Sequence, residues 1–239
     1  MGIVYSDEGH HGMTLVEKAD RFSEWMYSEI KPYLHGNIIE IGSGIGIFSS
    51  KVIRDFRGSK IVVSDIDPHY VQHLTERFKS NKNVSAIRLD FSKSTDFKQV
   101  KHRADSVFAL NVLEHVKDDV GALNNAYDLL AKGGTCIILV PAHKFLFNSL
   151  DKVMGHYRRY TKKELVQTVA KTKFKVKRVF YFNFFSIFGW YLNGNILRKT
   201  TILESGMGLL NLLVPFLRFF EKHLLRQMLG LSLIIVLEK

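Results

Sequence analysis

The sequence has few of the features that mark secreted or membrane-spanning proteins. Its 239 residues include one cysteine, Cys136, so no internal disulfide can form. Cys136 lies in the apolar run 135–140, where we expect a buried and inert thiol, and a reducing compartment suits this usage. The first eight residues have neither a basic stretch nor an apolar core, so no signal peptide is predicted. We therefore expect a cytoplasmic protein, with peripheral contact to a membrane as an open alternative.

No apolar run is long enough to predict a transmembrane helix. The run 179–192 is interrupted by asparagine, serine and glycine, and it is shorter than the ~20 residues that a spanning helix needs. The run 206–220 contains an asparagine, a proline and an arginine. Both runs could instead lie on a membrane surface or line an apolar substrate cleft.

Acidic residues are scarce relative to basic ones. There are 23 Asp and Glu against 34 Lys and Arg, which gives a formal net charge of +11. This balance favours an acidic partner, either nucleic acid, anionic lipid or a phosphorylated substrate, and does not choose among them. The sequence contains no zinc-ligand spacing and no recognisable RNA-binding signature, so a nucleic-acid-binding module is not favoured.

The order of the predicted elements indicates an α/β fold. A hydrophobic fraction of 46%, with 18 Phe and 9 Tyr, is sufficient for a large core. Apolar runs predict strands over 37–41, 60–64, 84–89, 106–110, 135–140, 175–182 and 232–237. Helical spacing predicts helices over 13–34, 47–56, 68–79, 118–130 and 162–171. The alternation over 37–141 predicts a parallel sheet with helices on both faces.

The most informative motif follows the first predicted strand. Residues 40–46 read Glu-Ile-Gly-Ser-Gly-Ile-Gly, a strand end and a glycine turn that precede a helix. Glycines allow positive φ and close approach of a ligand to the backbone. The spacing differs from the Gly-x-Gly-x-x-Gly dinucleotide fingerprint, and the Glu40 carboxylate would repel a pyrophosphate. Glu40 suits the ammonium of a bound amino acid, which disfavours a nicotinamide-dependent oxidoreductase.

Two further acids follow strand ends. Asp65 ends the second strand, where a carboxylate can accept both hydroxyls of a ribose, whereas Asp67 precedes a proline and better suits a helix cap. Asp90 follows the third strand and could accept from an adenine amino group, with a backbone contact from Phe91. Each acid alone could be a solvated strand end or a turn residue. Together they stand where open α/β sheets bind ligands.

These residues resemble the class I S-adenosylmethionine-dependent methyltransferases. Residues 40–46 resemble the first motif of that family, Asp65 its ribose-binding acid, Asp90 its adenine-binding acid and residues 111–115 its fourth motif. The resemblance implies a doubly wound, seven-stranded Rossmann-like sheet with an antiparallel last strand and a C-terminal helical and aromatic cap. It implies S-adenosylmethionine as the cofactor. The residues expected to bind it are Glu40, Gly42, Ser43, Gly44, Gly46, Asp65, Ile66, Asp90, Phe91 and Asn111.

The resemblance also divides the chain. We expect one domain over 1–239, with a leading helical segment over 1–36 and a cofactor-binding core over 37–141. Residues 142–230 would supply a substrate loop, the sixth strand and the cap, and 231–239 the final strand. Residues 141–143 and 155–160 resemble a bacterial-type subgroup of small-molecule methyltransferases, some of which are associated with polysaccharide or lipid modification.

Three histidines are candidates for chemistry. A nucleophile that loses a proton as it attacks needs a general base, and for this role His115 ranks first and His143 second. His156, Arg159 and Tyr160 are the expected acceptor-binding residues, since they carry donors for an anionic or hydroxylated group. Each could instead hydrogen-bond its own loop. Glu114-His115 resembles part of a Glu-x-x-Glu-His metal motif, but Asn111 replaces the first Glu, so we predict no required metal.

The sequence thus predicts a methyltransferase that acts on a small-molecule, sugar or lipid-like acceptor, with an anionic acceptor favoured by the charge. A nucleic-acid or protein acceptor stays open as an alternative. The sequence does not choose between oxygen, nitrogen and carbon as the methylated atom, and it does not determine the oligomeric state.

Overall fold

The computed structural model describes residues 7–100, 102–201, 204–225 and 228–239. The first six residues, which contribute to the expectation that there is no signal peptide, lie outside these ranges. The strands are β1 (Ile38–Ile41), β2 (Ile61–Asp65), β3 (Val84–Arg88), β4 (Ala104–Leu110), β5 (Leu130–Pro141), β6 (Lys175–Phe182) and β7 (Ser232–Glu238). The α-helices are α1 (Asp7–Lys18), α2 (Asp20–Ile30), α3 (Ile47–Asp55), α4 (Pro68–Arg77), α5 (Ser94–Phe97), α6 (Asp119–Leu129), α7 (Ser149–Val153), α8 (Lys162–Val169), α9 (Ser186–Trp190) and α10 (Glu204–Phe220). Short 3-10 helices are η1 (Lys31–Tyr33), η2 (Leu113–His115) and η3 (Lys144–Leu146), and the π-helices are η4 (Tyr191–Ile196) and η5 (Glu221–Leu225).

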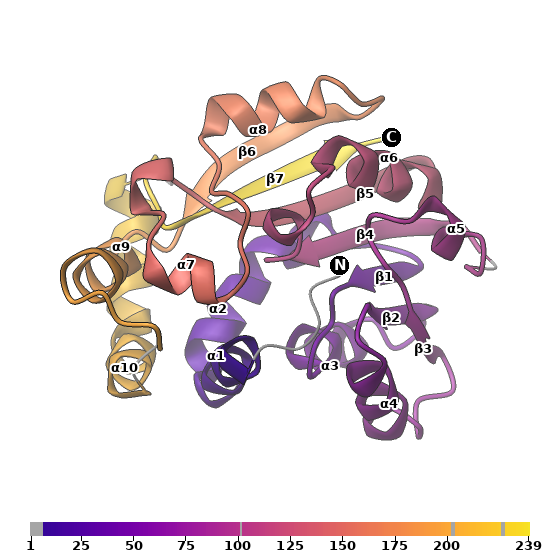
Figure 1. The fold of residues 1–239 in the computed structure, drawn as a ribbon. Coiled ribbons are helices and arrows are strands. Elements are labelled where there is room, and N and C mark those ends of the chain that lie inside the picture. The colour runs from indigo at the N-terminus through magenta and orange to yellow at the C-terminus, as the bar shows by residue number, and fades with distance from the viewer. Residues whose placement is uncertain (1–6, 101, 202–203, 226–227) are drawn as a thin grey trace.

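All seven strands form one sheet, in the order β3-β2-β1-β4-β5-β7-β6 (Figure 1). The pairs from β3 to β5 are parallel, and β7 pairs antiparallel with both β5 and β6. The predicted fold class is therefore confirmed, including the antiparallel final strand. The strand order reverses between β1 and β4. Open α/β sheets bind ligands at such a switch point.

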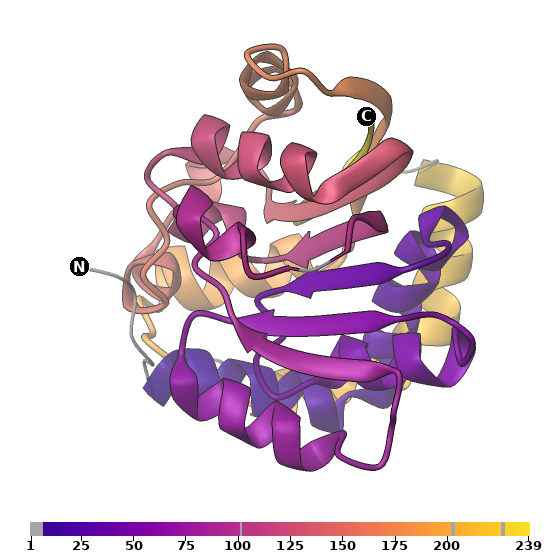
Figure 2. The ribbon, with the colours of Figure 1, turned by 90° about the vertical axis from the view of Figure 1, so that its right-hand side faces the viewer.

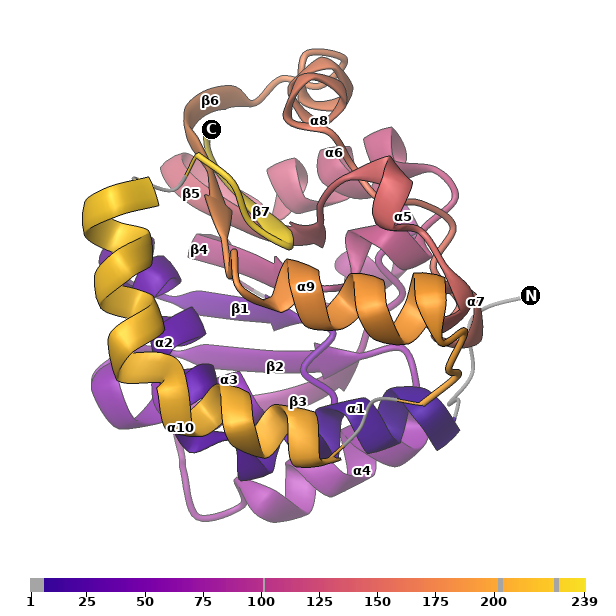
Figure 3. The same ribbon diagram turned by 90° about the vertical axis from the view of Figure 1, so that its left-hand side faces the viewer.

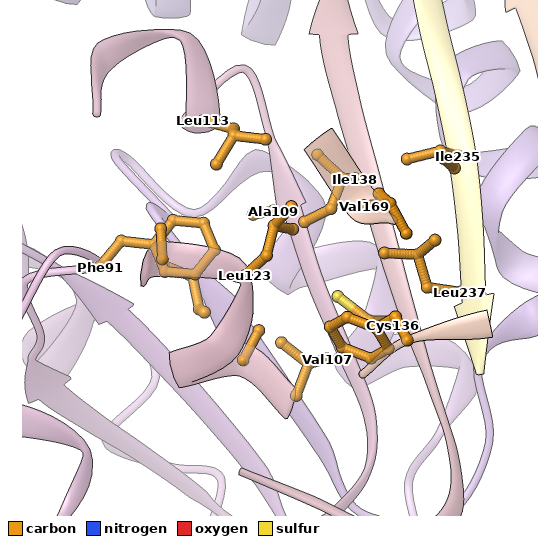
Figure 4. Packing of buried hydrophobic residues seen from close by; sticks show 14 of the residues in the cluster. Phe91, Val107, Ala109, Leu113, Leu123, Cys136, Ile138, Val169, Ile235 and Leu237 are labelled. Carbon is orange, nitrogen blue, oxygen red and sulfur yellow. The ribbon is translucent and has the colours of Figure 1, made fainter. Parts of the chain in front are cut away.

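Two apolar cores lie on opposite faces of the sheet, with helices covering both (Figure 2). Alternate residues of each central strand face opposite sides, so Ile138 packs with Leu123 and Val169 on one face (Figure 4), whereas Ile137 packs with Trp25 and Val52 on the other. Cys136 is fully buried, as expected, and desolvation raises the pKa of its thiol. The two-sided burial explains why the central strands are continuous apolar runs.

The leading helix expected over 13–34 is two helices. The chain leaves helical geometry at Ala19 (φ −90°, ψ 65°) and resumes it at Asp20. The bonds from Ala19 N to Leu15 O and from Ser23 N to Ala19 O persist, so the apolar spacing continues across the break. The break lets α2 pack on the sheet while α1 lies over the glycine turn, where Met13 meets Gly44.

The segment after β6 forms a cap of helices beside the carboxyl ends of the strands (Figure 3). The inner side of α10 packs on α2, with Val214 buried and Asn211 Oδ1 accepting from Phe22 N at 3.0 Å. Glu221 accepts from the backbone N–H groups of Asn183 (2.7 Å) and Phe184 (2.9 Å), which joins η5 to the end of β6. In the described part of the chain, none of the helices is both long and apolar enough to cross a bilayer.

Candidate active site

The carboxyl ends of β2, β1, β4 and β5 lie in one row, because these strands are parallel neighbours. The glycine turn follows β1, and Asp65 ends β2. Asn111 follows β4, and its N–H donates to Leu139 O of β5 at 2.9 Å. His143 follows β5. The expected cofactor residues and the expected base residues therefore occupy adjacent halves of one sheet edge.

The glycine turn after β1 depends on its glycines. Gly42, Gly44 and Gly46 have φ of 74°, 53° and 87°, which L side chains rarely adopt. A Cβ atom at Gly42 would come within 2.4 Å of Val112 Cγ2, and one at Gly44 within 2.3 Å of Met13 Sδ. The turn is thus covered closely from two sides, by α1 and by the segment after β4.

Glu40 is a buried carboxylate beside serine hydroxyls. It is 3% exposed, and Ser49 Oγ donates to its Oε2. Burial, helped by the nearby negative charge of Asp65 and opposed by hydrogen bonds from Ser49 and Ser43, raises the pKa of Glu40 to about 7. A ligand ammonium would restore the ionised form, so this site fits the amino-acid end of S-adenosylmethionine.

Asp65 links the glycine turn to the loop after β2. Its Oδ2 accepts from Gly44 N at 2.9 Å and its Oδ1 from Asp67 N at 3.0 Å. Ser43 N donates to Ser64 O at 2.8 Å, which ties the same turn to β2. Asp67 accepts from His69 N at the start of α4, so its predicted role as a helix cap is confirmed. Asp65 is therefore held at a fixed place beside the turn.

The third expected acid is less available. Asp90 Oδ1 accepts from both Ser92 N (2.9 Å) and Ser92 Oγ (2.6 Å), and Lys93 Nζ lies 3.4 Å from Oδ2. Phe91 is buried in the core, and its carbonyl accepts from Asn125. Ile66 O accepts from the Arg88 side chain at 3.0 Å. Adenine binding by Asp90 and Phe91, and cofactor binding by Ile66, stay predictions. The local hydrogen bonds of Asp90 make its role less favourable.

The segment after β4 places an acid and two histidines together. Asn111 is exposed with φ 55°, so its side chain does not cap a helix. Glu114 is fully buried, neither of its carboxylate oxygens has a hydrogen-bond partner, and burial raises its pKa to about 7. Burial lowers the pKa of His115 to about 4, so its imidazole is neutral at pH 7. The rings of His115 and His156 meet edge to face, 4.7 Å apart.

His143, at the end of β5, adopts φ 63° and stacks parallel on Tyr181, with ring centroids 5.1 Å apart. Its Nε2 is buried and has no hydrogen-bond partner. Partial burial lowers the pKa of His143, so its ring is also neutral at pH 7. His143 thus presents a lone proton acceptor beside the β4 end.

The three expected acceptor-binding residues have partners within the protein. Arg159 is 2% exposed, its Nε contacts both Asp151 oxygens (2.8 and 2.9 Å), and its guanidinium stacks on Trp190. His156 Nδ1 contacts Asp151 Oδ1 at 2.7 Å. The hydroxyl of Tyr160, which is 3% exposed, donates to Asp119. Acceptor binding by these side chains stays a prediction, and their partners favour a role in holding the loop.

Sequence reasoning missed Asp151 as a member of this site, and it considered Glu114 only as part of an incomplete metal motif. The sequence does not indicate that the Glu114 carboxylate is buried without a partner. The pairing of Asp151 with His156 and Arg159 arises from the fold of the loop after β5. The spacing of Asp151 before His156 and Arg159 is the signal that the sequence offers for this pairing.

Comparison with known proteins indicates a methyltransferase. Residues 39–136 match the family described as a methyltransferase domain. The sheet order and the strand-end acids agree with this match, and together they support a class I S-adenosylmethionine-dependent methyltransferase. S-adenosylmethionine is accordingly its cofactor.

Among known relatives, the chain is 26% identical over 164 residues to malonyl-acyl-carrier-protein O-methyltransferase 1 of Ilyobacter polytropus, over 66% of this chain and 59% of that one. A second malonyl-acyl-carrier-protein O-methyltransferase of the same organism is 24% identical, and the chain covers 55% of it. The chain thus spans less than two thirds of the length of these relatives. A methyltransferase structure from Archaeoglobus fulgidus has a TM-score of 0.59 at 16% identity, covering 91% of this chain and 94% of that one. The fold is likewise shared with Haemonchus contortus phosphoethanolamine N-methyltransferase 2 in complex with S-adenosyl-L-methionine, at TM-score 0.59 and 14% identity, over 91% of this chain and 52% of that one.

Proposed function

We propose that this protein transfers a methyl group from S-adenosylmethionine to a lipid-linked or otherwise amphipathic small-molecule acceptor that carries a nucleophilic oxygen. The observation that carries the proposal is the division of the sheet edge. Buried Glu40 and Asp65 stand at the ends of β1 and β2, and unpartnered histidine nitrogens stand beyond the ends of β4 and β5. Glu40, Asp65 and the glycine turn would hold the cofactor, which supplies a methyl group on a positively charged sulfur.

The chain's own chemistry would be limited to alignment and proton removal. We place the proton on His143 Nε2, because this atom has no partner and Tyr181 fixes the ring by stacking. His115 ranks second, in reversal of the order expected from sequence, because its deeper burial makes its imidazole a weaker base. His143→Gln is expected to lower kcat by roughly 10²–10⁴-fold without changing cofactor affinity.

An exposed apolar surface supports the lipid-linked class of acceptor. The outer side of α10 repeats large apolar residues at helical spacing, each at least 38% exposed, and we call this set the α10 stripe: Leu209, Leu212, Leu213, Phe216, Phe219 and Phe220. Phe188 of α9 (62% exposed) and Ile196 of η4 (60%) add to the exposed apolar residues of the cap. Exposed Arg198, Arg218 and Lys222 stand among these residues.

Basic residues beside an apolar helix face are typical of docking on anionic membranes. The net charge of +11 acts in the same direction. Docking would bring the cap, and with it the acceptor half of the sheet edge, to the layer in which a lipid-linked acceptor lies.

Vesicle co-sedimentation tests the docking. We expect binding to vesicles that contain phosphatidylglycerol, little binding to phosphatidylcholine vesicles, and release at high salt. Leu212→Glu/Phe216→Glu should abolish it, whereas Val176→Glu, which alters an exposed apolar residue on β6, should not. Equal binding by both variants, or no binding to either vesicle, would contradict docking through α10.

The acceptor class is tested with S-adenosylmethionine labelled in its methyl group and a bacterial extract separated into lipid, aqueous small-molecule, RNA and protein fractions. We expect label in the lipid fraction, absent for His143→Gln. Label confined to RNA or protein would support the alternative acceptors instead.

A further inference from the structure

Three potential metal-binding side chains converge beyond the end of β4. Glu114 and His115 belong to η2, and His156 belongs to the loop after α7. One ligand atom from each lies within 4.8 Å of the others. Glu114 Oε1 is 3.9 Å from His156 Nε2, too far for a hydrogen bond.

Each of the three presents an unused lone pair. Both oxygens of Glu114 and the Nδ1 of His115 are buried without a partner. The Nδ1 of His156 donates to Asp151, because a carboxylate can only accept, and this leaves Nε2 as the acceptor facing Glu114.

The bond to Asp151 therefore fixes the tautomer of His156 so that its free lone pair faces the Glu114 carboxylate, and the unpartnered Nδ1 of His115 lies in the same cluster. Without a cation between them, the Glu114 carboxylate and the two imidazoles form an unfavourable arrangement, because their desolvated lone pairs repel one another. A histidine whose second nitrogen donates to a carboxylate is the usual support of a metal-binding imidazole. Asp151 has that position, and Arg159 holds Asp151 in turn.

We propose that Glu114, His115 and His156 bind one divalent transition-metal cation of the Zn²⁺ or Fe²⁺ type. Two imidazoles and one carboxylate suit such borderline cations better than Mg²⁺. Ligands about 2.1 Å from a tetrahedral ion lie about 3.4 Å apart, so metal binding would draw together ligand atoms that now lie within 4.8 Å of one another. The sequence predicted no metal because Asn111 replaces the first glutamate of the motif. Asn111 is not one of the three proposed ligands, so this replacement does not exclude the site.

Three protein ligands leave at least one coordination position open. An oxygen of the acceptor could occupy it. This last step rests on the proposed function, whereas binding of the metal does not.

The test uses untagged full-length protein, freed of metal with a chelator that is then removed. Titration with Co²⁺ should produce visible d–d absorption bands that saturate at one equivalent and disappear when Zn²⁺ is added. Zn²⁺ in hundredfold excess over its Kd should raise Tm by about 5 °C or more, and Mg²⁺ should not. Neither S-adenosylmethionine nor an acceptor is present, so the outcome is independent of the proposed reaction.

Variants identify the ligands. Glu114→Gln and His156→Gln should each lose the Co²⁺ bands and the Zn²⁺-dependent rise in Tm. The control is His69→Gln/His73→Gln, which removes an exposed pair of histidines on α4 and should leave both signals intact. In metal-free protein, Glu114→Gln should retain or raise Tm, because it removes a buried carboxylate without a partner.

The proposal is overturned if wild-type protein shows neither Co²⁺ bands nor stabilisation by Zn²⁺. It is equally overturned if the α4 control loses the signals while Glu114→Gln keeps them, since the metal would then bind at the surface. In either case Glu114 would hold a proton instead of facing a metal.

Discussion

At the scale of single residues, Glu40 makes cofactor binding depend on pH. Its pKa is about 7 without ligand, and a ligand ammonium favours the ionised form. Binding below pH 7 therefore releases a proton, and affinity falls as the pH falls. We expect S-adenosylhomocysteine to bind about tenfold more weakly at about pH 5.5 than at about pH 7, where its ammonium is still mostly protonated.

Calorimetry at the two pH values measures this change. Glu40→Gln should bind more weakly at both and lose most of the pH dependence. An equally steep dependence in Glu40→Gln would show that another group is responsible.

Asp65 is the second residue with a defined expectation. If it accepts the ribose hydroxyls, Asp65→Ala should weaken cofactor binding by roughly 1.5–3 kcal/mol for each charged hydrogen bond lost. Asp67→Ala is the matched control, because Asp67 caps α4 and should lower stability by ~1 kcal/mol while leaving affinity unchanged. Unchanged affinity in a folded Asp65→Ala protein would refute the assignment.

The individual strand-end residues were predictable because a buried strand followed by a glycine turn is a local signal. Glu40, Asp65 and Asp67 could be assigned in this way. The cluster of Glu114, His115 and His156 could not, because it depends on how the loop after β5 folds against η2. For the same reason, the sequence does not show that Arg159 is turned inward onto Asp151.

At the scale of elements, Arg159 joins three parts of the acceptor half. It pairs with Asp151, donates to Ala142 O at 3.1 Å and stacks on Trp190 of α9. Removing it leaves the buried Asp151 short of a partner, so Arg159→Ala should lower the free energy of unfolding by ~3–5 kcal/mol. Arg158→Ala, which removes a partly exposed ion pair with Asp119, should cost at most about 1 kcal/mol. Urea denaturation compares the two, and similar costs would contradict the role of Arg159.

Helix α1 covers the glycine turn, so its amide hydrogen exchange should change when a ligand binds there. Met13 lies against Gly44, Arg77 of α4 pairs with Glu17 at 2.9 Å, and the His10 ring stacks on Tyr70. We expect S-adenosylhomocysteine to slow amide hydrogen exchange in residues 9–18, and to leave α8 on the opposite face unchanged. Protection of the glycine turn without any change in α1 would show that α1 does not close over the ligand.

The strands were predictable to within a few residues, because two-sided burial gives continuous apolar runs. The exception is β5, which begins at Leu130, before the predicted start at 135. The capping box of Thr161 and Glu164 at the start of α8 belongs to the same class of local signal. The length of α10 was not evident, because its residues are apolar on both the inner and the outer side and Pro215 interrupts the pattern. The break at Ala19 was missed because the apolar spacing runs through it.

At the scale of the whole molecule, the proposed function divides the sheet edge between two tasks. The ends of β1 and β2 would bind the cofactor, and the ends of β4 and β5, with the cap, would bind the acceptor. The α10 stripe lies on the cap side, so one face of the molecule would meet both the membrane and the acceptor. Changes in the α10 stripe are accordingly expected to leave cofactor affinity unaltered.

The most direct test of the central claim is calorimetric titration of the full-length protein with S-adenosylhomocysteine and, separately, with NAD. The account predicts one-to-one binding of S-adenosylhomocysteine, weakened by Asp65→Ala and preserved in Leu212→Glu/Phe216→Glu, with no heat of binding from NAD. Binding of NAD together with no response to S-adenosylhomocysteine would contradict it.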